Sequence, residues 1–323
     1  MNDLDPLAAR ELLVEQVRLE AAGVVSLRLV DPDGGELPPW APGAHIDLRL
    51  PSGTVRQYSL CGPLDDSRSY TVAVLREEHG RGGSAEVHDT GLVGRVLQVR
   101  GPRNHFALVD APHYLFLAGG IGVTPILAMV REAAASGASW ELYYGGRSRP
   151  AMAFTGVLSA IGAERVHLVP QDEAGLLPVA ELIGAAPPGS AVYCCGPEGM
   201  VRAVTEACTD TRPGALHVER FTAPPGGDVH STTDARPFRV ELRRSGVTLD
   251  VPPERTLLDV VREAAPDVAF SCEEGYCGSC ETKVLAGVPE HHDTVLSDEE
   301  RERGDTMMIC VGRAASELLA LDL

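Results

Sequence analysis

The chain has 323 residues, of which 44% are hydrophobic, and a formal net charge of −18 at pH 7. This length predicts two or three domains, and the apolar content is enough to give each of them a core. The negative charge argues against binding to nucleic acid or to an anionic membrane surface, because both are themselves negatively charged.

The N-terminal stretch has no basic flank and no apolar run, so we expect neither a signal peptide nor a membrane anchor. The chain contains eight cysteines. Without an export signal, they favour a reduced, cytoplasmic setting. We expect a monomer.

The negative charge is uneven along the chain. From Asp234 onward there are 19 acidic and 10 basic residues, a net charge of −9, so half of the excess lies on little more than a quarter of the chain. This quarter carries either a generic acidic surface or a docking face for a basic partner. Lys283 is the only lysine, so any bound phosphate must be held by arginines, hydroxyls and backbone N–H groups.

Residues 10–108 form short alternating runs separated by turn signals, which predicts a small antiparallel β-barrel. The expected strands are Leu12–Leu19, Val24–Val30, His45–Leu50, Val55–Leu60, Tyr70–Leu75 and Val96–Val99.

One of these strands carries a candidate cofactor site. Arg56, Tyr58 and Leu60 share one face of the strand, while Ser59 points to the other. An arginine can pair with a phosphate through two hydrogen bonds, and an aromatic ring can lie against a flat cofactor. An exposed Arg–Tyr pair is the alternative interpretation.

A glycine-rich segment, Gly80–Gly83, leads through Ser84 into a short helix expected at Ala85–Thr90. Glycines followed by a serine cap at a helix start make an anion site from backbone N–H groups. An ordinary glycine turn is the alternative.

Three segments of this region resemble the flavin domain of the phthalate dioxygenase reductase family, whose members are iron–sulfur flavoproteins of the ferredoxin–NADP reductase superfamily. The segments are Arg56-x-Tyr58-Ser59-Leu60, Gly82-Gly83-Ser84 and Pro102-Arg103-Asn104-x-Phe106. The resemblance implies FMN, with Arg56 and Ser84 near its phosphate. It also places Tyr58 and Ser59 beside the isoalloxazine, with the serine hydroxyl near N5. The absence of a separate adenine-binding signature also favours FMN over FAD.

The middle third alternates strands with helices, which predicts a parallel α/β sheet with ligand sites at the carboxyl ends of its strands. The first strand, from Tyr114, runs into a helix that is expected to end at Ser136, with Gly137 as its stop. The residues of the intervening turn and helix start include Gly119, Gly120, Gly122, Thr124 and Pro125. The glycines let a dinucleotide pyrophosphate approach the helix N-terminus, although the spacing is not the usual Gly-x-Gly-x-x-Gly fingerprint.

Two further strand ends carry candidate binding residues. The strand Trp140–Tyr144 and the strand Ser190–Cys194 both end in polar or glycine-containing loops. The loop residues are Arg147, Ser148 and Arg149 after the first strand, and Cys195, Gly196 and Pro197 after the second.

All three strand ends match the same family in the same order. The resemblance implies that Gly119–Pro125 holds the pyrophosphate and the nicotinamide side, with Thr124 reaching toward the flavin. It further implies that Cys195-Gly196-Pro197 borders the nicotinamide and that Phe221 covers a flavin face. The residues placed around the reacting rings are then Ser59, Thr124, Cys195 and Phe221. Taken alone, Cys195 is better explained as a small buried residue than as a catalytic thiol, because no neighbouring base activates it.

The loop after Trp140–Tyr144 bears on the choice of dinucleotide. At this place an acidic residue bonds the ribose 2′-hydroxyl, whereas an arginine accommodates a 2′-phosphate. Arg147 and Arg149 flank a hydroxyl, with no acid before Phe154, which favours NADPH. Against this, the resemblance implies NADH for many members, and a loop arginine is more often solvated or paired with an acidic neighbour.

Residues 223–236 are rich in Pro, Gly, Ser and Thr and have no apolar period, which predicts a linker. It separates the predicted domains, which are an FMN-binding β-barrel at 1–109, an NAD(P)-binding α/β domain at 110–222 and a [2Fe–2S] ferredoxin domain at 237–323.

The last quarter contains four cysteines in the pattern Cys-x4-Cys-x2-Cys…Cys, namely Cys272, Cys277, Cys280 and Cys310. This is the plant-type arrangement for four thiolates around a [2Fe–2S] cluster. Gly275, Gly278 and Ser279 keep side-chain bulk out of the loop and let N–H groups point at the sulfurs. A zinc site, which usually takes evenly spaced pairs, and two disulfides, which fit a small secreted domain, are the alternatives.

Short strands and one helix are expected around this loop. The strands are Phe238–Arg243, Val247–Val251, Thr282–Leu285 and Met307–Val311, the last of which would deliver Cys310. The helix is expected to be capped by Thr256 and to run through Glu263. This pattern resembles a plant-type ferredoxin domain.

The sequence therefore predicts a multi-domain electron-transfer reductase, built from an antiparallel β-barrel flavin domain, an α/β parallel-sheet nucleotide domain and an α+β ferredoxin domain. NAD(P)H would supply two electrons to FMN, which would pass them singly to the cluster and on to a terminal oxygenase docked near the acidic ferredoxin domain. The expected partner is a Rieske-type aromatic dioxygenase or demethylase, with a haem-thiolate monooxygenase as the alternative. A different class, an iron–sulfur redox sensor or a zinc- or disulfide-stapled binding module, leaves the flavin and nucleotide motifs unexplained.

Overall fold

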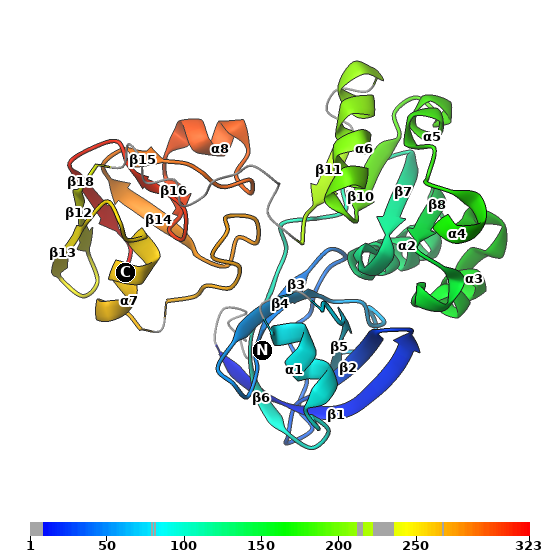
Figure 1. Cartoon of the computed structure of the whole chain (residues 1–323), viewed down its shortest axis with the longest axis horizontal. Helices are drawn as coiled ribbons and strands as arrows, with labels where there is room; N and C mark the ends of the chain where they lie inside the picture. The colour runs from blue at the N-terminus through cyan, green and yellow to red at the C-terminus, as the bar shows by residue number, and fades with distance from the viewer. Residues whose placement is uncertain (1–8, 79, 81, 212–215, 222–235, 267) are drawn as a thin grey trace. The chain divides into compact units, whose positions relative to one another are not determined.

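The computed structural model describes the whole chain except residues 1–8, 79, 81, 212–215, 222–235 and 267. The chain forms two compact units, Met1–Arg220 and Phe221–Leu323 (Figure 1). The predicted linker, 223–236, lies outside the described residues except for Arg236.

The first unit begins with a six-stranded antiparallel sheet in the order β4-β3-β6-β1-β2-β5. Its strands are β1 (Arg10–Ala21), β2 (Val24–Val30), β3 (His45–Arg49), β4 (Val55–Ser59), β5 (Ser69–Leu75) and β6 (Val96–Arg103). An isolated bridge between Leu60 and Val72 joins the two edge strands and closes the sheet into a barrel. Helix α1 (Gly83–Asp89) packs beside β5. The core is a set of alternating aliphatic residues, so the predicted barrel is confirmed.

The register of β3 and β4 sets which side chains meet on each face. Tyr58 is paired with Ile46, a fully buried core residue, whereas Ser59 is paired with His45. Successive side chains of a strand alternate between its faces, so Ser59 and His45 lie together on the face away from the barrel core.

A five-stranded parallel sheet follows in the order β11-β10-β7-β8-β9. Its strands are β7 (His113–Gly119), β8 (Ser139–Gly146), β9 (Val166–Pro170), β10 (Ala191–Cys195) and β11 (Leu216–Glu219). The helices are α2 (Val123–Ala135), α3 (Thr155–Gly162), α4 (Gln171–Ala174), α5 (Val179–Ala185) and α6 (Glu198–Thr211). Short 3-10 turns lie at Gly120–Gly122, Arg149–Ala151 and Ala163–Arg165. Strand order runs outward in both directions from the β7–β10 pair, which is where such sheets bind their ligands.

Hydrogen bonds between described residues join the barrel to the parallel sheet within the first unit, and three of these contacts bear on the site. Arg131, on α2, donates to the carbonyl oxygens of Cys61 and Gly62 just after β4. The N–H of Ala22 donates to the carbonyl oxygen of Pro150, at 2.8 Å. The third contact joins Ser59 to Glu219 and belongs to the candidate site.

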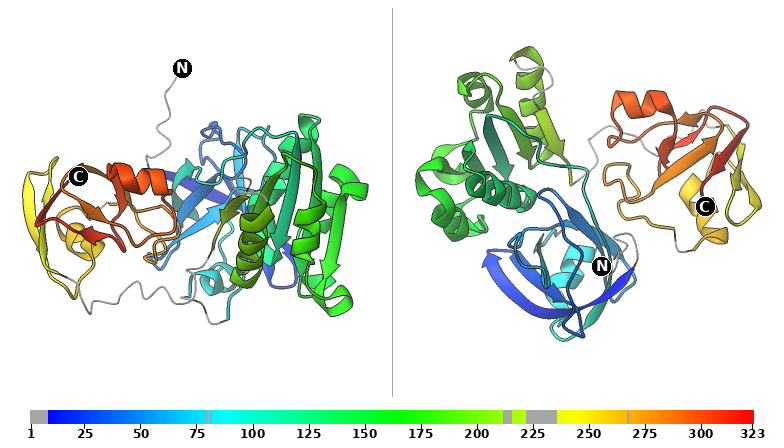
Figure 2. Two further views of the ribbon diagram at one scale, coloured as in Figure 1. Left: turned by 90° about the horizontal axis from the view of Figure 1, so that it is seen from above. Right: turned by 180° about the vertical axis from the view of Figure 1, so that it is seen from behind.

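The second unit is an α+β domain, shown from two further directions in Figure 2. Its main sheet has the order β13-β12-β18-β14-β16, with a separate β15–β17 pair. The strands are β12 (Phe238–Leu242), β13 (Val247–Val251), β14 (Glu281–Ala286), β15 (Pro289–Glu290), β16 (Thr306–Met308), β17 (Arg313–Ala314) and β18 (Leu318–Leu321). The helices are α7 (Leu257–Ala264) and α8 (Asp298–Arg303). As predicted, Thr256 caps α7, and its hydroxyl accepts from the N–H of Asp259 at 3.0 Å.

Two local predictions were wrong. Helix α1 begins at Gly83, not at Ala85, so Ser84 lies inside its first turn and Gly82 occupies the cap position. Strand β16 ends at Met308, so Cys310 lies in the turn that follows the strand rather than on it.

Candidate functional site

The dinucleotide motifs meet at the carboxyl edge of the parallel sheet, because the glycines let two loops touch. A methyl group on Gly119 would lie 2.6 Å from Cδ of Pro197 and 2.9 Å from Sδ of Met200. A methyl group on Gly122 would overlap the carbonyl of Cys195. Only hydrogen fits at these positions, so the Gly119–Gly122 turn lies directly against the Cys195–Pro197 loop.

Helix α2 starts at this junction. It continues the 3-10 turn Gly120–Gly122, and the N–H of Val123 donates to the carbonyl oxygens of Gly120 and Ile121. No described side chain caps the turn or the helix, so the N–H groups that an anion could meet are those of the glycine turn. Pro125 is in the first turn, as predicted. Thr124 is buried, and its hydroxyl donates to the carbonyl oxygen of Ile121 at 3.0 Å.

The loop after β8 places the two arginines near acidic residues that the local sequence does not reveal. Nε of Arg149 lies 2.9 Å from both carboxylate oxygens of Glu173, on α4. The carbonyl oxygen of Arg147 accepts from the N–H of Asp172. A phosphate bound at this loop must therefore compete with Glu173 for the Arg149 guanidinium.

In the barrel, Arg56 lies against the glycine loop that precedes α1. A methyl group on Gly83 would be 2.8 Å from both Cγ and Nε of Arg56, so the guanidinium stem and the start of the helix are in contact. Gly82 has a φ of 85°, and no described side chain caps the helix. A guanidinium beside uncapped N–H groups suits a terminal phosphate. Ser84 is already engaged, since its hydroxyl accepts from the N–H of Glu77 at 3.0 Å.

A hydrogen bond between Ser59 and Glu219 joins the end of β4, which carries the predicted flavin residues, to the end of β11 at the carboxyl edge of the parallel sheet. The Ser59 hydroxyl donates to Oε2 of Glu219 at 3.3 Å. Burial raises the pKa of the Glu219 carboxyl to about 8, partly offset by the serine hydrogen bond. Glu219 is also the β11 partner of Cys195, whose thiol pKa is raised well above its usual value by burial. A neutral, fully buried thiol supports the interpretation of Cys195 as a lining residue rather than a nucleophile.

The sequence analysis missed Glu219 as a functional residue. The feature of the sequence that could have pointed to Glu219 is a carboxylate at the end of a short strand, two residues before the aromatic Phe221. Phe221 follows β11 so closely that chain connectivity keeps it near this strand end.

In the second unit, the cysteine loop aims backbone N–H groups at the sulfurs. The N–H of Glu274 points at Sγ of Cys272, 3.3 Å away. Sγ of Cys277 accepts from the N–H groups of Cys272, at 3.4 Å, and Ser279, at 3.5 Å. Such hydrogen bonds stabilise thiolates and, with them, the charge of a bound cluster.

Left-handed backbone makes this wrapping possible. Glu273, Gly275 and Gly278 have φ values of 59°, 73° and 74°. A methyl group on Gly275 would lie 2.8 Å from Cγ2 of Val311 and 3.1 Å from Cα of Asp293. The loop therefore packs at Gly275 with no room for a side chain.

The four predicted ligands interact with one another. Hydrogen bonding with Cys277, and then with Cys310, lowers the pKa of Cys272. Contacts with Cys272 and Cys280 raise the pKa of Cys310. Within the described ranges, no three side chains surround a single metal ion. Contacts thus link Cys277 to Cys272, Cys272 to Cys310 and Cys310 to Cys280. Such a series of thiols suits a cluster of two bridged irons, in which no one iron takes all four sulfurs.

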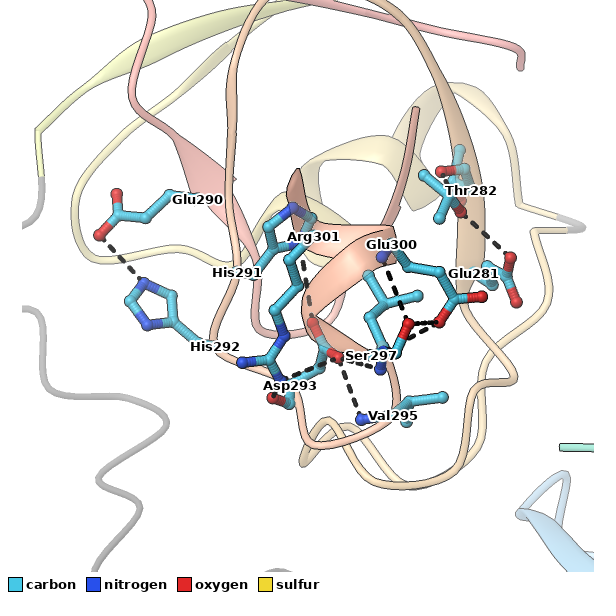
Figure 3. A network of polar contacts seen from close by, with 12 residues as sticks. Glu281, Thr282, Glu290, His291, His292, Asp293, Val295, Ser297, Glu300 and Arg301 are labelled. Atoms are coloured by element: carbon cyan, nitrogen blue, oxygen red, sulfur yellow. Dashed lines mark hydrogen bonds and ion pairs between the residues drawn. The ribbon is translucent and has the colours of Figure 1, made fainter. Parts of the chain in front are cut away.

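Asp293 packs against the cysteine loop at Gly275, and Figure 3 shows its contacts with Val295 and Arg301. Its carboxylate accepts from the N–H groups of Val295 and Leu296, at 3.0 and 2.9 Å, and lies 3.8 Å from the Arg301 guanidinium. The neighbouring N–H of Thr294 donates to the carbonyl oxygen of Gly275 at 2.8 Å. This network fixes the segment against which the loop packs.

Comparison with known proteins agrees with this geometry. Residues 240–315 match the 2Fe-2S iron-sulfur cluster binding domain. The phthalate dioxygenase reductase of Burkholderia cepacia is 37% identical over 311 residues, covering 94% of each chain. A solved structure of phthalate dioxygenase reductase, described as modular for electron transfer from pyridine nucleotides to [2Fe-2S], is 35% identical with a TM-score of 0.71 and covers 98% of each chain. The chain belongs to the phthalate dioxygenase reductase family.

Other family members are as similar or more so. The phenoxybenzoate dioxygenase subunit beta of Ectopseudomonas oleovorans is 42% identical over 325 residues and matches all of both chains. An intact type IV self-sufficient cytochrome P450 monooxygenase is 40% identical with a TM-score of 0.88, and this chain spans 41% of its length.

The predicted family and fold class of this chain are confirmed. So is the predicted oxidoreductase activity with an iron–sulfur domain. No helix in the described part of the chain is long and apolar enough to cross a membrane. The residue-level assignments remain predictions.

Proposed function

We propose that this reductase carries electrons from NAD(P)H through FMN and a [2Fe–2S] cluster to the terminal oxygenase of a Rieske-type aromatic dioxygenase or demethylase. When bound, the flavin accepts two electrons at once and the cluster passes them on singly. The chain's own residues bind these groups, set their separation and handle the proton.

One observation carries the first half of this proposal. The Ser59–Glu219 hydrogen bond joins β4, which carries the predicted flavin residues, to β11, which lies beside the predicted nicotinamide loop after β10. Transfer between a nicotinamide and a flavin needs the two rings in contact, so their binding strands must end at the same place. Residues 160 positions apart in sequence meet here.

The cofactor-holding roles follow from the same geometry. Arg56, with Gly82 and Gly83, would hold the FMN phosphate, while Tyr58 would lie beside its ring system. The Leu60 side chain is buried in the barrel core, so Leu60 would contribute through its backbone alone. Ser84 would join through its N–H and its hydroxyl, because a hydroxyl that accepts from the N–H of Glu77 can still donate its own proton to a phosphate.

The dinucleotide site would be formed by the two loops that pack together at the carboxyl edge of the parallel sheet, and the cluster site by the four cysteines of the second unit. Gly119, Gly120, Gly122, Pro125, Gly196 and Pro197 would take the dinucleotide. Thr124, Cys195 and Phe221 would lie around the reacting rings. The cluster ligands would be Cys272, Cys277, Cys280 and Cys310.

Glu219 would hold a proton near neutral pH, because burial raises its pKa to about 8. Ser59, which donates to Oε2 of Glu219, can then exchange its hydroxyl proton with that carboxyl. The pair would act as a proton reservoir beside the flavin, with the proton held on an Oε atom of Glu219 and moved through Oγ of Ser59.

We further propose that the dinucleotide is NADPH, bound through Arg147, Ser148 and Arg149. The presence of two guanidiniums at the end of β8 supports this. The pairing of Arg149 with Glu173 opposes it in part, so Arg147 would supply the first contact.

Steady-state reduction of cytochrome c with each dinucleotide tests this choice. Arg147→Ala should raise the KM for NADPH and leave that for NADH nearly unchanged. Glu173→Gln frees Arg149 and should lower the KM for NADPH. A clear preference of the wild-type protein for NADH would refute the NADPH assignment.

The partner would dock near the acidic second unit, since the residues from Asp234 onward carry half of the excess negative charge. Similarity to a P450 fusion favours a haem-thiolate monooxygenase as the second candidate partner. Anaerobic mixing of the reduced protein with a Rieske oxygenase and, separately, with a haem-thiolate monooxygenase that lacks its own reductase tests the choice. Faster reduction of the haem protein would overturn the proposed partner.

The described cysteines form no disulfide, which supports the proposed cytoplasmic setting, where thiols stay reduced. We propose a monomer, and light scattering of the purified protein tests it.

A further inference from the structure

His45 is a buried polar side chain that the proposed function does not use. It is 2% exposed. Within the described part of the chain, neither of its ring nitrogens has a hydrogen-bond partner. Buried polar groups are nearly always hydrogen-bonded, and each exception calls for an explanation. An imidazole can take up a proton at one nitrogen while it releases one from the other.

The β3–β4 register places His45 beside Ser59. The N–H of Leu60 donates to the carbonyl oxygen of Ala44 at 2.8 Å, so a backbone hydrogen bond joins that pair, although the N–H of Ala44 donates to Ala41. The next pair, His45 and Ser59, is then a pair without backbone hydrogen bonds, in which side chains approach most closely. Their Cβ atoms are expected to be about 4.5–5.5 Å apart on one face of the sheet.

On its other side, His45 is covered by the segment that follows β6. Asn104 donates from Nδ2 to the carbonyl oxygen of Pro42 at 2.9 Å, which holds this segment against the start of β3. The His105 ring stacks on His45 with centroids 5.5 Å apart and an interplanar angle of 24°. His105 is exposed, so it connects the buried imidazole to solvent.

Burial keeps His45 neutral, and the positive groups around it act in the same direction. Burial lowers its pKa well below the usual value, and Arg103 and His105 add to this effect. Arg103, its partner on β6, forms an ion pair with Asp47 at 2.5 Å and is thereby compensated. Ser59, the β4 partner of His45, is hydrogen-bonded to Glu219. A neutral imidazole between a hydroxyl and a solvent-exposed histidine is suited to relay protons without holding charge.

We propose that His45 and His105 form the path by which protons move between solvent and the Ser59–Glu219 pair. This inference rests on the proposed function. Oxidation of one reduced nicotinamide yields two electrons and one proton, and the electrons leave singly through the cluster. One proton must therefore leave the flavin site for every nicotinamide oxidised. Because neither ring nitrogen of His45 is hydrogen-bonded in the structure and its ring stacks on that of His105, each transfer needs a hydrogen bond made by rotation of the imidazole or through a bridging water. By such bonds Ser59 passes the proton to one nitrogen of His45, the other nitrogen releases a proton to His105, and His105 exchanges with water.

The first test uses the flavin-free protein and needs no change at His45. In protein labelled with 15N in its histidines, the ring-nitrogen shifts of His45 should show a step near pH 8, as Glu219 titrates. The step should disappear in Glu219→Gln. A His45 that shows no step would overturn the proposal.

The second test measures electron delivery to cytochrome c in the FMN- and cluster-loaded protein. His45→Gln keeps a polar side chain without a proton relay, and His45→Ala leaves space for free imidazole. Both should slow turnover at least about tenfold, in line with the usual size of proton-transfer contributions, and raise the solvent isotope effect. Added imidazole should restore the rate of His45→Ala, which a purely structural role would not allow.

A matched control is His167→Gln, because His167 also stacks on an aromatic ring, that of Tyr143, but lies in β9. It should leave the rate and the isotope effect unchanged. If the wild-type protein reduces cytochrome c and His45→Gln matches it in rate and isotope effect, the relay is wrong while the proposed function stands. If the wild-type protein shows no dinucleotide-dependent reduction, the proposed function itself is wrong.

Discussion

Ser59 and Glu219 are 160 residues apart in the sequence and are joined by a hydrogen bond of 3.3 Å between Oγ and Oε2. Ser59 ends β4 of the barrel, and Glu219 ends β11 of the parallel sheet. The bond thus connects the two parts of the first unit at the place where flavin and nicotinamide are proposed to meet. It also leaves a carboxyl group inside the protein, with consequences for stability.

Glu219 should make the stability of the flavin-free protein depend on pH. In the folded protein the carboxyl keeps its proton up to about pH 8, while in the unfolded chain it loses it near its ordinary value of 4.5. The unfolded state therefore releases a proton first, and the free energy of unfolding should fall as pH rises from 4.5 to 8. The slope is about 1.4 kcal/mol per pH unit at most for one group.

Urea unfolding of wild-type and Glu219→Gln protein across this range measures the effect. The amide carries no charge at any pH, so the variant should gain stability over the wild type as pH rises. A difference that stays constant between pH 4.5 and 8 would contradict the raised pKa.

Arg56→Ala should lose the flavin. Arg56 is in contact with the start of α1 at Gly83, and the only lysine of the chain, Lys283, lies in the second unit. Mass spectrometry of the released flavin gives both its identity and its occupancy. Arg49→Ala is a suitable control, because Arg49 is exposed on neighbouring β3 and should keep full occupancy. Release of FAD would refute the FMN assignment.

The parts of the site that rest on local spacing were accessible from the sequence. Each of these parts is a motif of a few consecutive residues, so it can be recognised without knowledge of the fold. They are the cysteine loop, the glycine turn before α2 and the Arg56–Leu60 strand. The strands of the barrel alternate because one face is buried, and they were placed to within a few residues.

The rest depends on contacts between distant segments. Glu219 acquires its role only when β11 pairs beside β10, and Arg149 meets Glu173 only when α4 packs at the end of β9. Strand β18 was missed because Leu318–Leu321 is a short apolar run without alternation. Cys310 was placed on a strand because its apolar neighbours fit one, yet the chain turns there to bring the thiol to the other cysteines.

Replacing any of the four cluster cysteines by serine should remove or cripple the [2Fe–2S] centre while sparing flavin reduction by the dinucleotide. The reason is that the flavin and dinucleotide residues lie in the first unit, apart from Phe221. Iron analysis and the rate of flavin bleaching measure the two effects separately. Cys208→Ala should keep full iron, because Cys208 belongs to the core beside β10. Full iron in Cys310→Ala would overturn the ligand assignment.

Gly275→Ala should destabilise the cysteine loop and lower its iron content. The position combines a left-handed backbone with a Cβ that would press on Val311 and on the backbone of Asp293. Gly246→Ala is a matched control, since Gly246 has a similar φ of +68° but open space around it. We expect the control to cost about 1–2 kcal/mol in unfolding free energy from backbone strain alone. Equal iron content in both variants would show that the packing at Gly275 is unimportant.

The central claim is that electrons enter from a reduced nicotinamide, pass through FMN and reach the cluster. The most direct measurement is the absorption spectrum of the purified protein, recorded under anaerobic conditions before and after addition of the reduced dinucleotide. The account predicts a yellow flavin envelope with a red-brown shoulder, both bleached by the dinucleotide, and only the flavin bleached in Cys310→Ser. A colourless protein with bound zinc, or a cluster that stays oxidised while the flavin is reduced in the wild type, would contradict it.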